Sequence, residues 1–497
     1  MNKLKQTRRG FLRAVGVGAA ALAMGPRASG AADRTRAGKP NIVFIFADDM
    51  GFGDPKCFNG ESKISTPNID RLAAGGIRFL DAHAPASVCV PSRYGLMTGR
   101  YPFRTAIKWN NDRVIEKGRM TLASLLKKNG YHTGAVGKWH LGFEGGKKVD
   151  YSKPMRGGPT DCGFDYYFGI PASLDIPPYY YVENDRCVSP PTERIESNYT
   201  KGVSRIQGAF WRGGGVARGF KHDEVLPKFA RKAVSFIESH QADAKNKDRP
   251  LFLYLPLAAP HTPWMPTGKF AGSSKAGMYG DFVSQVDDAV GRVLAALDRC
   301  KLTDNTLVIF TSDNGPVWYA VDVKKYGHSS VGRLRGMKGD AWEGGHHMPF
   351  VAKWPGKIKP ATSSDEVICF TDMLATFAAI VGDKLPANAG EDSYNILPAM
   401  LGEKYDKPIR QATVTKAGFF TIRQGKWKLI LGRGSGGFSA PRRIKPKQGE
   451  PKGQLYDMKT DPGETTNVYK DHPGIVERLT KLLDKYKKDG RSVSPRR

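Results

Sequence analysis

The sequence contains few cysteines for its length, six in 497 residues. That number is too small for a disulfide-based scaffold in a chain of this size. Acidic residues are also scarce, 48 against 77 basic ones, which gives a formal net charge of +29. No hydrophobic run is long enough to cross a bilayer as a permanent helix, and no internal repeat is visible. These features exclude a small disulfide-rich domain, a stable membrane span and a repeat protein.

The excess of positive charge indicates a polyanionic partner, because a strongly basic protein attracts such a ligand and raises its local concentration. Nucleic acid is the usual candidate, but the sequence has no zinc-finger, RNP or helix-turn-helix pattern, so we expect no nucleic-acid partner. A sulfated polysaccharide is the other polyanion to consider. The length of 497 residues favours two unequal domains.

The N-terminus has the pattern of an export signal. A twin-arginine motif reads Thr7-Arg8-Arg9-Gly10-Phe11-Leu12-Arg13, and a short apolar run and small residues follow up to residue 31. We therefore predict a twin-arginine signal peptide over residues 1–32, the twin-arginine export machinery as a partner, and a periplasmic or secreted location. A cytosolic amphipathic tail is the alternative. The predicted signal removes basic residues and no acidic one, so the mature chain remains strongly basic.

Beyond the signal, apolar runs typical of buried strands alternate with helical patterns. Strands are predicted at residues 41–46, 133–136, 251–257 and 306–311. Helices are predicted from Thr66-Pro67, where Thr66 is expected to be the N-cap, to Gly75, and at 120–129 and 279–298. This alternation predicts an α/β fold in which helices sandwich a mixed, mostly parallel sheet. In such folds functional sites gather at the carboxyl ends of the strands.

The pattern of predicted elements changes near residue 405, where short strands replace the alternation of strands and helices. Short antiparallel strands are predicted at 413–415, 419–423, 427–431 and 455–457, and a helix at 474–488. We therefore divide the chain into a main domain, residues 33–404, and a smaller C-terminal subdomain of antiparallel sheet plus helix, residues 405–497. The subdomain includes a basic loop at 433–452, which is either solvated or a polyanion-contacting surface. Residues 491–497 are predicted to be a disordered tail.

Acidic residues follow two of the predicted strands. Asp48 and Asp49 come directly after the first strand, and Asp313 and Asn314 follow the strand at 306–311. Adjacent carboxylates repel each other unless a cation lies between them. Oxygen ligands without nearby histidine or cysteine favour calcium or magnesium over zinc. Taken alone, an Asp-Asp pair after a strand is more often a turn and a helix cap.

A cysteine, a proline and an arginine open a short helical segment, Cys89-Val90-Pro91-Ser92-Arg93, which leads to Gly99. Proline suits the first turn of a helix, and the free N–H groups and dipole of that end attract an anion. In Gly137-Lys138-Trp139-His140, the lysine and histidine are two residues apart, so in an extended segment both side chains leave the same face. One can neutralise an oxyanion while the other transfers a proton.

These motifs together resemble the type I, formylglycine-dependent sulfatases, the arylsulfatase A-like and carbohydrate sulfatases. The resemblance covers most of the chain from Asn41 to about Thr466 and implies an alkaline phosphatase-like fold. It also implies that a maturation enzyme oxidises Cys89 to formylglycine, whose hydrated aldehyde attacks the sulfur and later reforms as sulfate leaves. Such a protein is a sulfuric ester hydrolase that acts on a sulfate ester, and the basic charge favours a sulfated polysaccharide or oligosaccharide.

The resemblance assigns roles residue by residue. A calcium ion would be held by Asp48, Asp49, Asp313, Asn314 and the modified Cys89. Catalytic roles fall to Cys89, Arg93, Lys138, His140, His261 and Lys338. His261 lies in an Ala-Pro-His-Thr-Pro segment and is a candidate proton donor. Substrate contacts are assigned to Ser173, Lys138, His261 and Lys338.

One position departs from the family pattern. Relatives commonly read Glu-Gly-Gly-x-Arg-x-Pro, whereas this chain has His347 at the arginine position. A guanidinium, which is always charged and has several N–H donors, is thus replaced by an imidazole.

With Cys89 converted, five cysteines remain. Of these, Cys162 and Cys187 are close enough in sequence to form a disulfide after export or to stay free. The aromatic segment 177–181 is suited to stacking on sugars or to loop packing.

Two other functions compete with this interpretation. A phosphatase or phosphodiesterase of the alkaline phosphatase superfamily would need a serine or threonine nucleophile and histidine-rich zinc ligands, which the pattern around Cys89 lacks. A non-catalytic protein that binds sulfated glycans on the same scaffold would bind without releasing sulfate. The sugar, the sulfated position, endo or exo action and the oligomeric state do not follow from the sequence.

Overall fold

The computed structural model describes residues 38–107 and 112–494. The predicted twin-arginine signal, residues 1–32, lies outside the described residues. The described residues from Asn41 onward form one compact unit, to which both predicted sheets belong. None of the described helices is long and apolar enough to cross a membrane.

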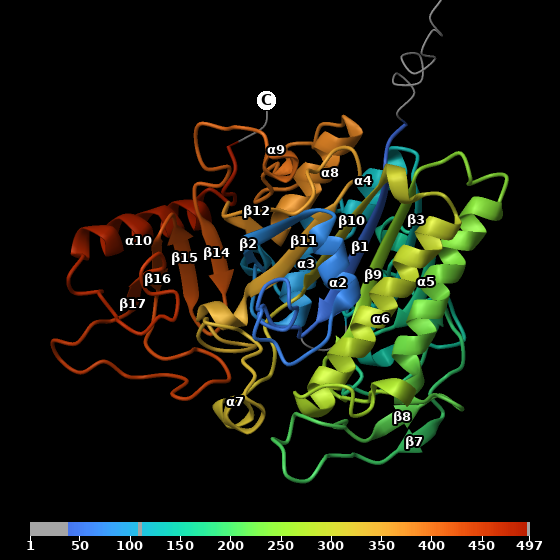
Figure 1. The fold of residues 1–497 in the computed structure, drawn as a ribbon, viewed down its shortest axis with the longest axis horizontal. Helices are drawn as coiled ribbons and strands as arrows, with labels where there is room; N and C mark the ends of the chain where they lie inside the picture. Colours follow the sequence, from blue (N-terminus) through green and yellow to red (C-terminus); the bar gives the residue numbers. More distant parts are fainter. Residues whose placement is uncertain (1–37, 108–111, 495–497) are drawn as a thin grey trace, which may run out of the picture. The chain divides into compact units, whose positions relative to one another are not determined.

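A large mixed sheet organises this unit (Figure 1). In the described chain its strands follow the order β12-β2-β11-β10-β1-β9-β3-β4-β5-β6, with β13 also paired to β2. The bounds are β1 Asn41–Asp48, β2 Ile77–His83, β3 His132–Lys138, β4 Tyr166–Ile170, β5 Val182–Glu183, β6 Arg186–Cys187, β9 Leu251–Pro260, β10 Thr306–Ser312, β11 His347–Lys353, β12 Thr362–Ser364 and β13 Ile368–Cys369. The central pairs β10-β1, β1-β9, β9-β3 and β3-β4 are parallel, and β10-β11 and β11-β2 are antiparallel. The predicted fold class is confirmed.

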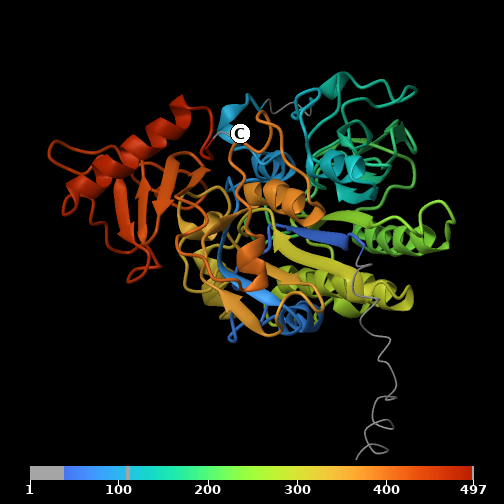
Figure 2. The same cartoon turned by 90° about the horizontal axis from the view of Figure 1, so that it is seen from above.

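The central strand β1 is buried on both faces, which is why it reads as a continuous apolar run. Val43 and Ile45 point into one core, formed with helices α2 (Pro67–Ala74), α5 (Val225–Ala242) and α6 (Gly277–Arg299). Phe44 and Phe46 point into the other, formed with α3 (Cys89–Thr98), α4 (Leu122–Lys128) and α8 (Met373–Val381). Figures 1 and 2 show these two groups of helices on opposite sides of the sheet. The shorter helices are α7 (Ala320–Tyr326) and α9 (Leu397–Leu401).

A small antiparallel sheet forms the C-terminal part, as the sequence predicts. Its strands are β14 Thr413–Lys416, β15 Phe420–Gln424, β16 Trp427–Ile430 and β17 Gln454–Asp457. Helix α10 (Pro473–Lys488) packs on it through Leu479, Leu483 and Tyr486. The predicted disorder of the tail is wrong for part of it, because Ser492 and Val493 donate backbone hydrogen bonds to Glu391. A short two-stranded sheet, β7 Glu193–Ile195 and β8 Gly214–Val216, lies in the long segment before α5.

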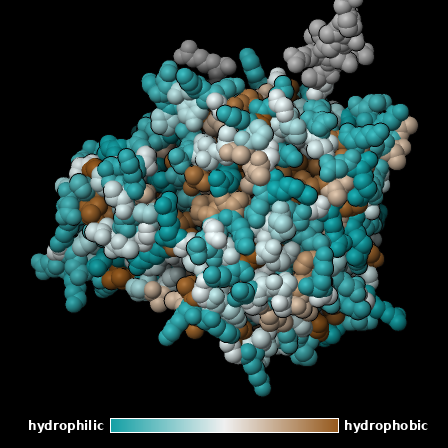
Figure 3. All heavy atoms as spheres, viewed as in Figure 1, coloured by the Kyte–Doolittle hydropathy of each residue, from teal (hydrophilic) through white to brown (hydrophobic). Residues whose placement is uncertain are grey.

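The surface in Figure 3 is largely hydrophilic, with apolar side chains scattered among polar ones. The large hydrophobic side chains exposed in the described chain are Val188, Tyr199, Met278, Val321, Val323, Tyr405 and Ile444. All six cysteines fall within the described residues and are free, so Cys162 and Cys187 are not bonded to each other.

The start of α2 differs from the sequence-based expectation. Thr66 does not cap this helix, because its hydroxyl donates to Asp70 and accepts from the backbone N–H of Lys56. The carboxylate of Asp287, on α6, takes its place. It accepts the backbone N–H groups of Asn68 and Ile69 at 3.0 and 2.8 Å. The cap therefore also fixes α2 to α6 on one face of the sheet.

We expect Asp287→Ala to destabilise the protein by about 1–2 kcal/mol, because two buried amide donors at the start of α2 lose their acceptor. Equilibrium denaturation in urea measures the change. Asp288→Ala is the matched control, since Asp288 pairs with the exposed Arg292 and such pairs contribute little. Equal stabilities for the two variants would contradict the assigned cap.

Candidate functional site

The predicted acidic residues meet at one edge of the large sheet. Strands β1 and β10 are parallel neighbours, and their register places Ala47 opposite Ser312. Asp48 ends β1, and Asp313 and Asn314 directly follow β10. Asp49 has a φ of 65°, a left-handed backbone conformation rare for a non-glycine residue. Its backbone N–H donates to the Asp313 carboxylate at 3.2 Å, which ties the two strand ends together.

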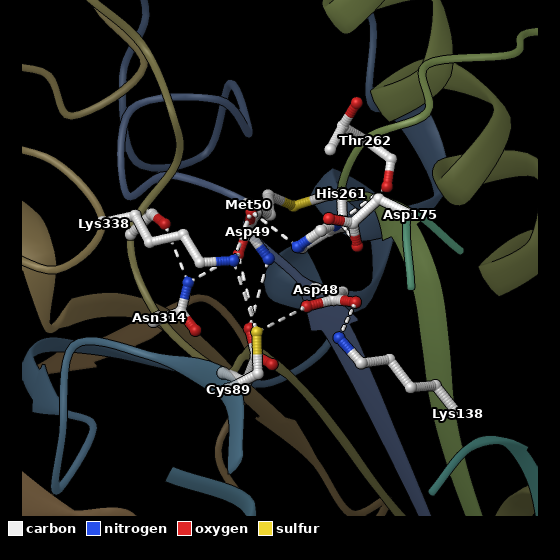
Figure 4. A network of polar contacts seen from close by, with 12 residues as sticks. Asp48, Asp49, Met50, Cys89, Lys138, Asp175, His261, Thr262, Asn314 and Lys338 are labelled. Atoms are coloured by element: carbon white, nitrogen blue, oxygen red, sulfur yellow. Dashed lines mark hydrogen bonds and ion pairs between the residues drawn. The ribbon is translucent and has the colours of Figure 1, made fainter. Parts of the chain in front are cut away.

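Cys89 begins helix α3 and points into this acidic group (Figure 4). Its Sγ lies 3.4 Å from Asp48 Oδ1 and 3.3 Å from Lys338 Nζ. Burial and the neighbouring Asp313 raise the pKa of the Cys89 thiol well above its ordinary value, although Lys138 and Lys338 oppose this. The unmodified thiol is therefore protonated and a weak nucleophile. Helix α3 ends at Gly99, as predicted. Gly99 has a left-handed backbone conformation.

Three buried cations surround the three carboxylates. The Arg93 guanidinium donates through Nε and Nη2 to Asp313 Oδ2 at 3.1 and 2.8 Å. Lys138 Nζ lies 2.5 Å from Asp48 Oδ2, and Lys338 Nζ lies 2.6 Å from Asp49 Oδ1. Fixed positive and negative charges therefore cancel, so a bound divalent cation would leave an excess positive charge that suits an anionic substrate.

The electrostatic balance differs among the carboxylates. Burial raises the pKa of Asp313 to about 6, and repulsion from Asp48 adds to this while Arg93 opposes it. Burial also acts to raise the pKa of Asp48, but the Lys138 ammonium outweighs it. The pKa of Asp48 therefore lies well below its ordinary value. The carboxylates thus share a site in which they repel one another.

The residues present fit a hard divalent cation. Asn314 donates through Nδ2 to Asp49 Oδ1 at 2.6 Å, while its own Oδ1 is buried and has no hydrogen-bond partner among the described residues. A half-turn of the amide would exchange these two atoms. Carboxylate and amide oxygens are the ligands that calcium and magnesium prefer. The sequence-predicted ligand set, Asp48, Asp49, Asp313 and Asn314, is therefore brought together around Cys89.

His261 reaches the same group from the end of β9. Its Nε2 lies 3.6 Å from Asp49 Oδ2, and its Nδ1 lies 2.6 Å from the carbonyl oxygen of Thr262. The ring is thus held with Nε2 directed toward the carboxylates. His261 and Lys338 line a hollow of about 160 Å³ that opens over Asp49.

His140 and Ser173 are less closely connected to this group. Burial and the Lys138 charge lower the pKa of His140 well below its ordinary value, and its Nδ1 is buried without a partner in the described chain. His140 lines a separate hollow of about 540 Å³, together with Tyr151 and Tyr180. Ser173 is buried, and its carbonyl oxygen accepts the N–H of Ile176 in a turn. It does not line either hollow.

Sequence reasoning missed most of the residues that line the hollow beside His261, among them Asp175, Arg212 and Phe438. Phe438 comes from the basic loop, where its backbone N–H donates to Asp340 at 2.7 Å. The start of this loop is therefore packed beside Lys338 rather than wholly solvated. No local pattern distinguishes these residues, since each comes to the hollow through tertiary contacts.

A second polar cluster joins the two sheets. Asp81, His83, Glu343 and His347 present possible ligand atoms within 4.8 Å of one another. Cations from the small sheet already pair with both carboxylates, since Arg423 Nη2 lies 2.5 Å from Asp81 Oδ2 and Lys428 Nζ lies 2.9 Å from Glu343 Oε1. We therefore interpret this cluster as a charge-balanced contact between the two sheets and not as a metal centre.

His347, at the position where relatives commonly have arginine, belongs to this cluster. Its Nδ1 lies 2.9 Å from Glu343 Oε2, and its Nε2 lies 2.9 Å from the carbonyl oxygen of Leu80. Both partners are acceptor atoms, and the imidazole lies between them. His347 thus contacts both the Glu343 carboxylate and the backbone of β2.

We expect His347→Leu to destabilise the protein by about 1–3 kcal/mol, because the Glu343 carboxylate and the Leu80 carbonyl both lose their polar contact with the imidazole. His347→Arg should retain most of the stability, since guanidinium provides both donors. Denaturation midpoints in urea measure both variants. A leucine variant as stable as the parent, or an arginine variant as unstable as the leucine one, would contradict this assignment.

The fold is that of a family of known hydrolases. Residues 40–382 match the family model described as Sulfatase. The chain belongs to the sulfatase family, and it is a sulfatase. An N-acetylgalactosamine-6-O-sulfatase of Bacteroides thetaiotaomicron is 36% identical over 489 residues, covering 90% of this chain and 93% of the relative. Human arylsulfatase A is 35% identical over 466 residues, and this match covers 89% of this chain and 86% of the relative.

Solved structures agree with these sequence relatives. A structure from Bacteroides thetaiotaomicron, described under the metabolism of multiple glycosaminoglycans, superposes with a TM-score of 0.78 at 34% identity, covering 90% of this chain and 99% of that one. A sulfatase from Pseudoalteromonas has a TM-score of 0.73 at 24% identity, covering 94% of each chain, and so shares the fold.

Proposed function

We propose that this protein is a carbohydrate sulfatase that uses a formylglycine made from Cys89 and a bound calcium ion. The observation that carries this proposal is the position of Cys89, at a helix N-terminus and within 3.4 Å of both Asp48 and Lys338. A structural cysteine does not require three carboxylates and three buried cations around it. A maturation enzyme would act on this residue before export by the twin-arginine route.

A sulfated polysaccharide or oligosaccharide is the substrate class that we propose. The net charge of +29 favours a polyanion. A hollow of about 510 Å³ that contains Lys416 and Arg442 shares Phe438 with the hollow beside His261, which would suit a further charged sugar unit. The relative named an N-acetylgalactosamine-6-O-sulfatase makes a sulfated amino sugar the first compound to test.

The proposed cofactors would be held by residues already described. Asp48, Asp49, Asp313 and Asn314 would ligate calcium, and when present the formylglycine and the ion supply an activated hydroxyl nucleophile and a fixed positive charge. Arg93, Lys138 and Lys338 bind the sulfate oxygens and stabilise the charge that develops on them. They are buried and already fixed by ion pairs, so little reorganisation is needed.

Two histidines carry the proposed proton transfers. The Thr262 carbonyl fixes His261 Nδ1, which leaves Nε2 free to donate a proton to the departing alcohol oxygen. His140 has a lowered pKa and is therefore unprotonated near neutral pH, as a proton acceptor must be. Its Nδ1, which has no partner among the residues that the structure describes, is the nitrogen available for this role. Ser173 remains a predicted substrate contact without a direct observation in its favour.

Replacement of Cys89 tests the nucleophile. We expect Cys89→Ala to reduce sulfate release by about a thousandfold or more, because the residue that becomes the nucleophile is lost. Cys89→Ser should be inactive or stop after one turnover as a trapped sulfo-enzyme, visible by intact-protein mass spectrometry. Ion chromatography of released sulfate measures turnover. Cys300→Ser, at the end of α6, is the control and should retain activity, whereas full turnover by Cys89→Ser would refute the proposal.

Removal of calcium tests the metal site. Calcium at about 100 times its Kd should stabilise the folded protein by about 2.7 kcal/mol, so chelation with EGTA should lower both Tm and activity. Asp313→Asn should abolish the calcium-dependent shift in Tm, whereas Asp304→Asn, an exposed acid, should keep it. A parent protein whose Tm does not respond to calcium would contradict the proposed ligand set.

A further inference from the structure

The side chain of Arg212 lines the hollow beside His261 and is accessible from it. Other residues around this hollow are Asp49, His261 and Lys338, and 52% of the Arg212 side-chain surface is exposed. Asp49 and Lys338 pair with each other at 2.6 Å, so their charges offset each other. The hollow thus combines residues of the acidic group with a guanidinium that a ligand can reach.

Buried contacts hold Arg212 in position. Its Nη1 donates to Asp175 Oδ2 at 2.5 Å and to the Asp175 carbonyl oxygen at 3.1 Å, and its backbone N–H donates to the same carbonyl at 3.2 Å. The Tyr179 hydroxyl donates to the Arg212 carbonyl oxygen at 2.6 Å. Asp175 is only 6% exposed, and Figure 4 shows its carboxylate beside His261. The position of the guanidinium is therefore set before a ligand binds.

Most of the Arg212 donors remain available. A guanidinium has five N–H donors, and in the described chain only Nη1 donates to protein acceptors. Nε and Nη2 have no hydrogen-bond partner among the described residues. Together these two nitrogens form an edge that can bind two oxygens of a carboxylate or a sulfate at once. The ion pair with Asp175 leaves this edge open.

We propose that Arg212 is a specificity-determining residue that binds a second anionic group of the substrate, a carboxylate or a sulfate other than the one released. This inference rests on the proposed function, in which His261 faces the departing alcohol oxygen and the sugar therefore occupies this hollow. A fixed guanidinium with an open two-donor edge is suited to either oxyanion. A substrate with a single charged group would leave that edge to water.

The alternative is that Arg212 only neutralises the buried Asp175 carboxylate. The two roles differ in how the effect of a replacement depends on the substrate. A residue that only pairs with Asp175 affects every sulfate ester alike, whereas a contact with a second anion matters only when that anion is present. A cycle that combines a protein variant with removal of one charge from the substrate separates the two roles.

The experiment compares kcat/KM within two pairs of substrates that differ by one anionic group. The first pair is N-acetylgalactosamine 6-sulfate and its 4,6-disulfate. The second is a disaccharide of a uronic acid and N-acetylgalactosamine 6-sulfate, and its carboxyl-reduced form. With the parent protein, we expect the more anionic member of at least one pair to react about 10- to 100-fold faster, as for a hydrogen bond between charged groups. The pair that shows this preference identifies the bound group as sulfate or carboxylate.

Variants of Arg212 should remove the preference. Arg212→Gln should reduce it to within about twofold. Arg212→Lys should reduce it at least threefold, since an ammonium lacks the two-donor edge, and it keeps a positive charge beside Asp175 if the glutamine variant does not fold. Arg218→Gln removes the same charge from an exposed residue outside the hollow and should keep the full preference.

The outcomes that overturn the inference are distinct. If Arg212→Gln and Arg212→Lys lower turnover of all four compounds by one factor, Arg212 serves only Asp175 and the inference is wrong. If the parent protein prefers neither of the more anionic compounds, or releases sulfate from 4-nitrophenyl sulfate alone, the inference is also wrong while sulfate-ester hydrolysis stands. Release from none of the sugars and not from the aryl ester would instead contradict the proposed function.

Discussion

The repulsion among Asp48, Asp49 and Asp313 is the constraint on which the rest of the site depends. Parallel pairing of β1 with β10 brings these carboxylates to one buried edge of the sheet, where like charges destabilise one another. Arg93, Lys138 and Lys338 offset this, each from a different segment of the chain. The site is therefore held together by its charges, and its residues cannot be exchanged singly without leaving a buried charge unpaired.

The sequence predicts the parts of the site whose cause is local. An apolar run followed by two aspartates predicts a buried strand ending in carboxylates, and β1 ends at Asp48. Cys89 and Pro91 before Gly99 predict a short helix, which the structure has. The arrangement of these segments around one point came from the family resemblance, because spacing alone does not fix which strands are neighbours.

Other features could not be predicted, since they depend on contacts between distant residues. Arg212 donates to Asp175, which is 37 residues away in the sequence. Asp287 caps α2 through Asn68, 219 residues away, and Arg423 pairs with Asp81, 342 residues away. None of these pairs lies in a motif. The same reasoning explains the error at Thr66, where a nearby lysine amide and Asp70 use the hydroxyl that would otherwise cap the helix. Likewise, the composition of residues 491–497 predicts disorder because it does not show the backbone hydrogen bonds of Ser492 and Val493 to Glu391.

Conversion of Cys89 to an aldehyde gives its burial among charged groups a chemical purpose. The most direct measurement is mass spectrometry of the tryptic peptide from Phe79 to Arg93, from protein made in its native host. We expect the mass of formylglycine at position 89 and formation of a hydrazone with an aldehyde-reactive hydrazide. A peptide that retains an alkylatable thiol, from protein that nevertheless releases sulfate at full rate, would contradict it.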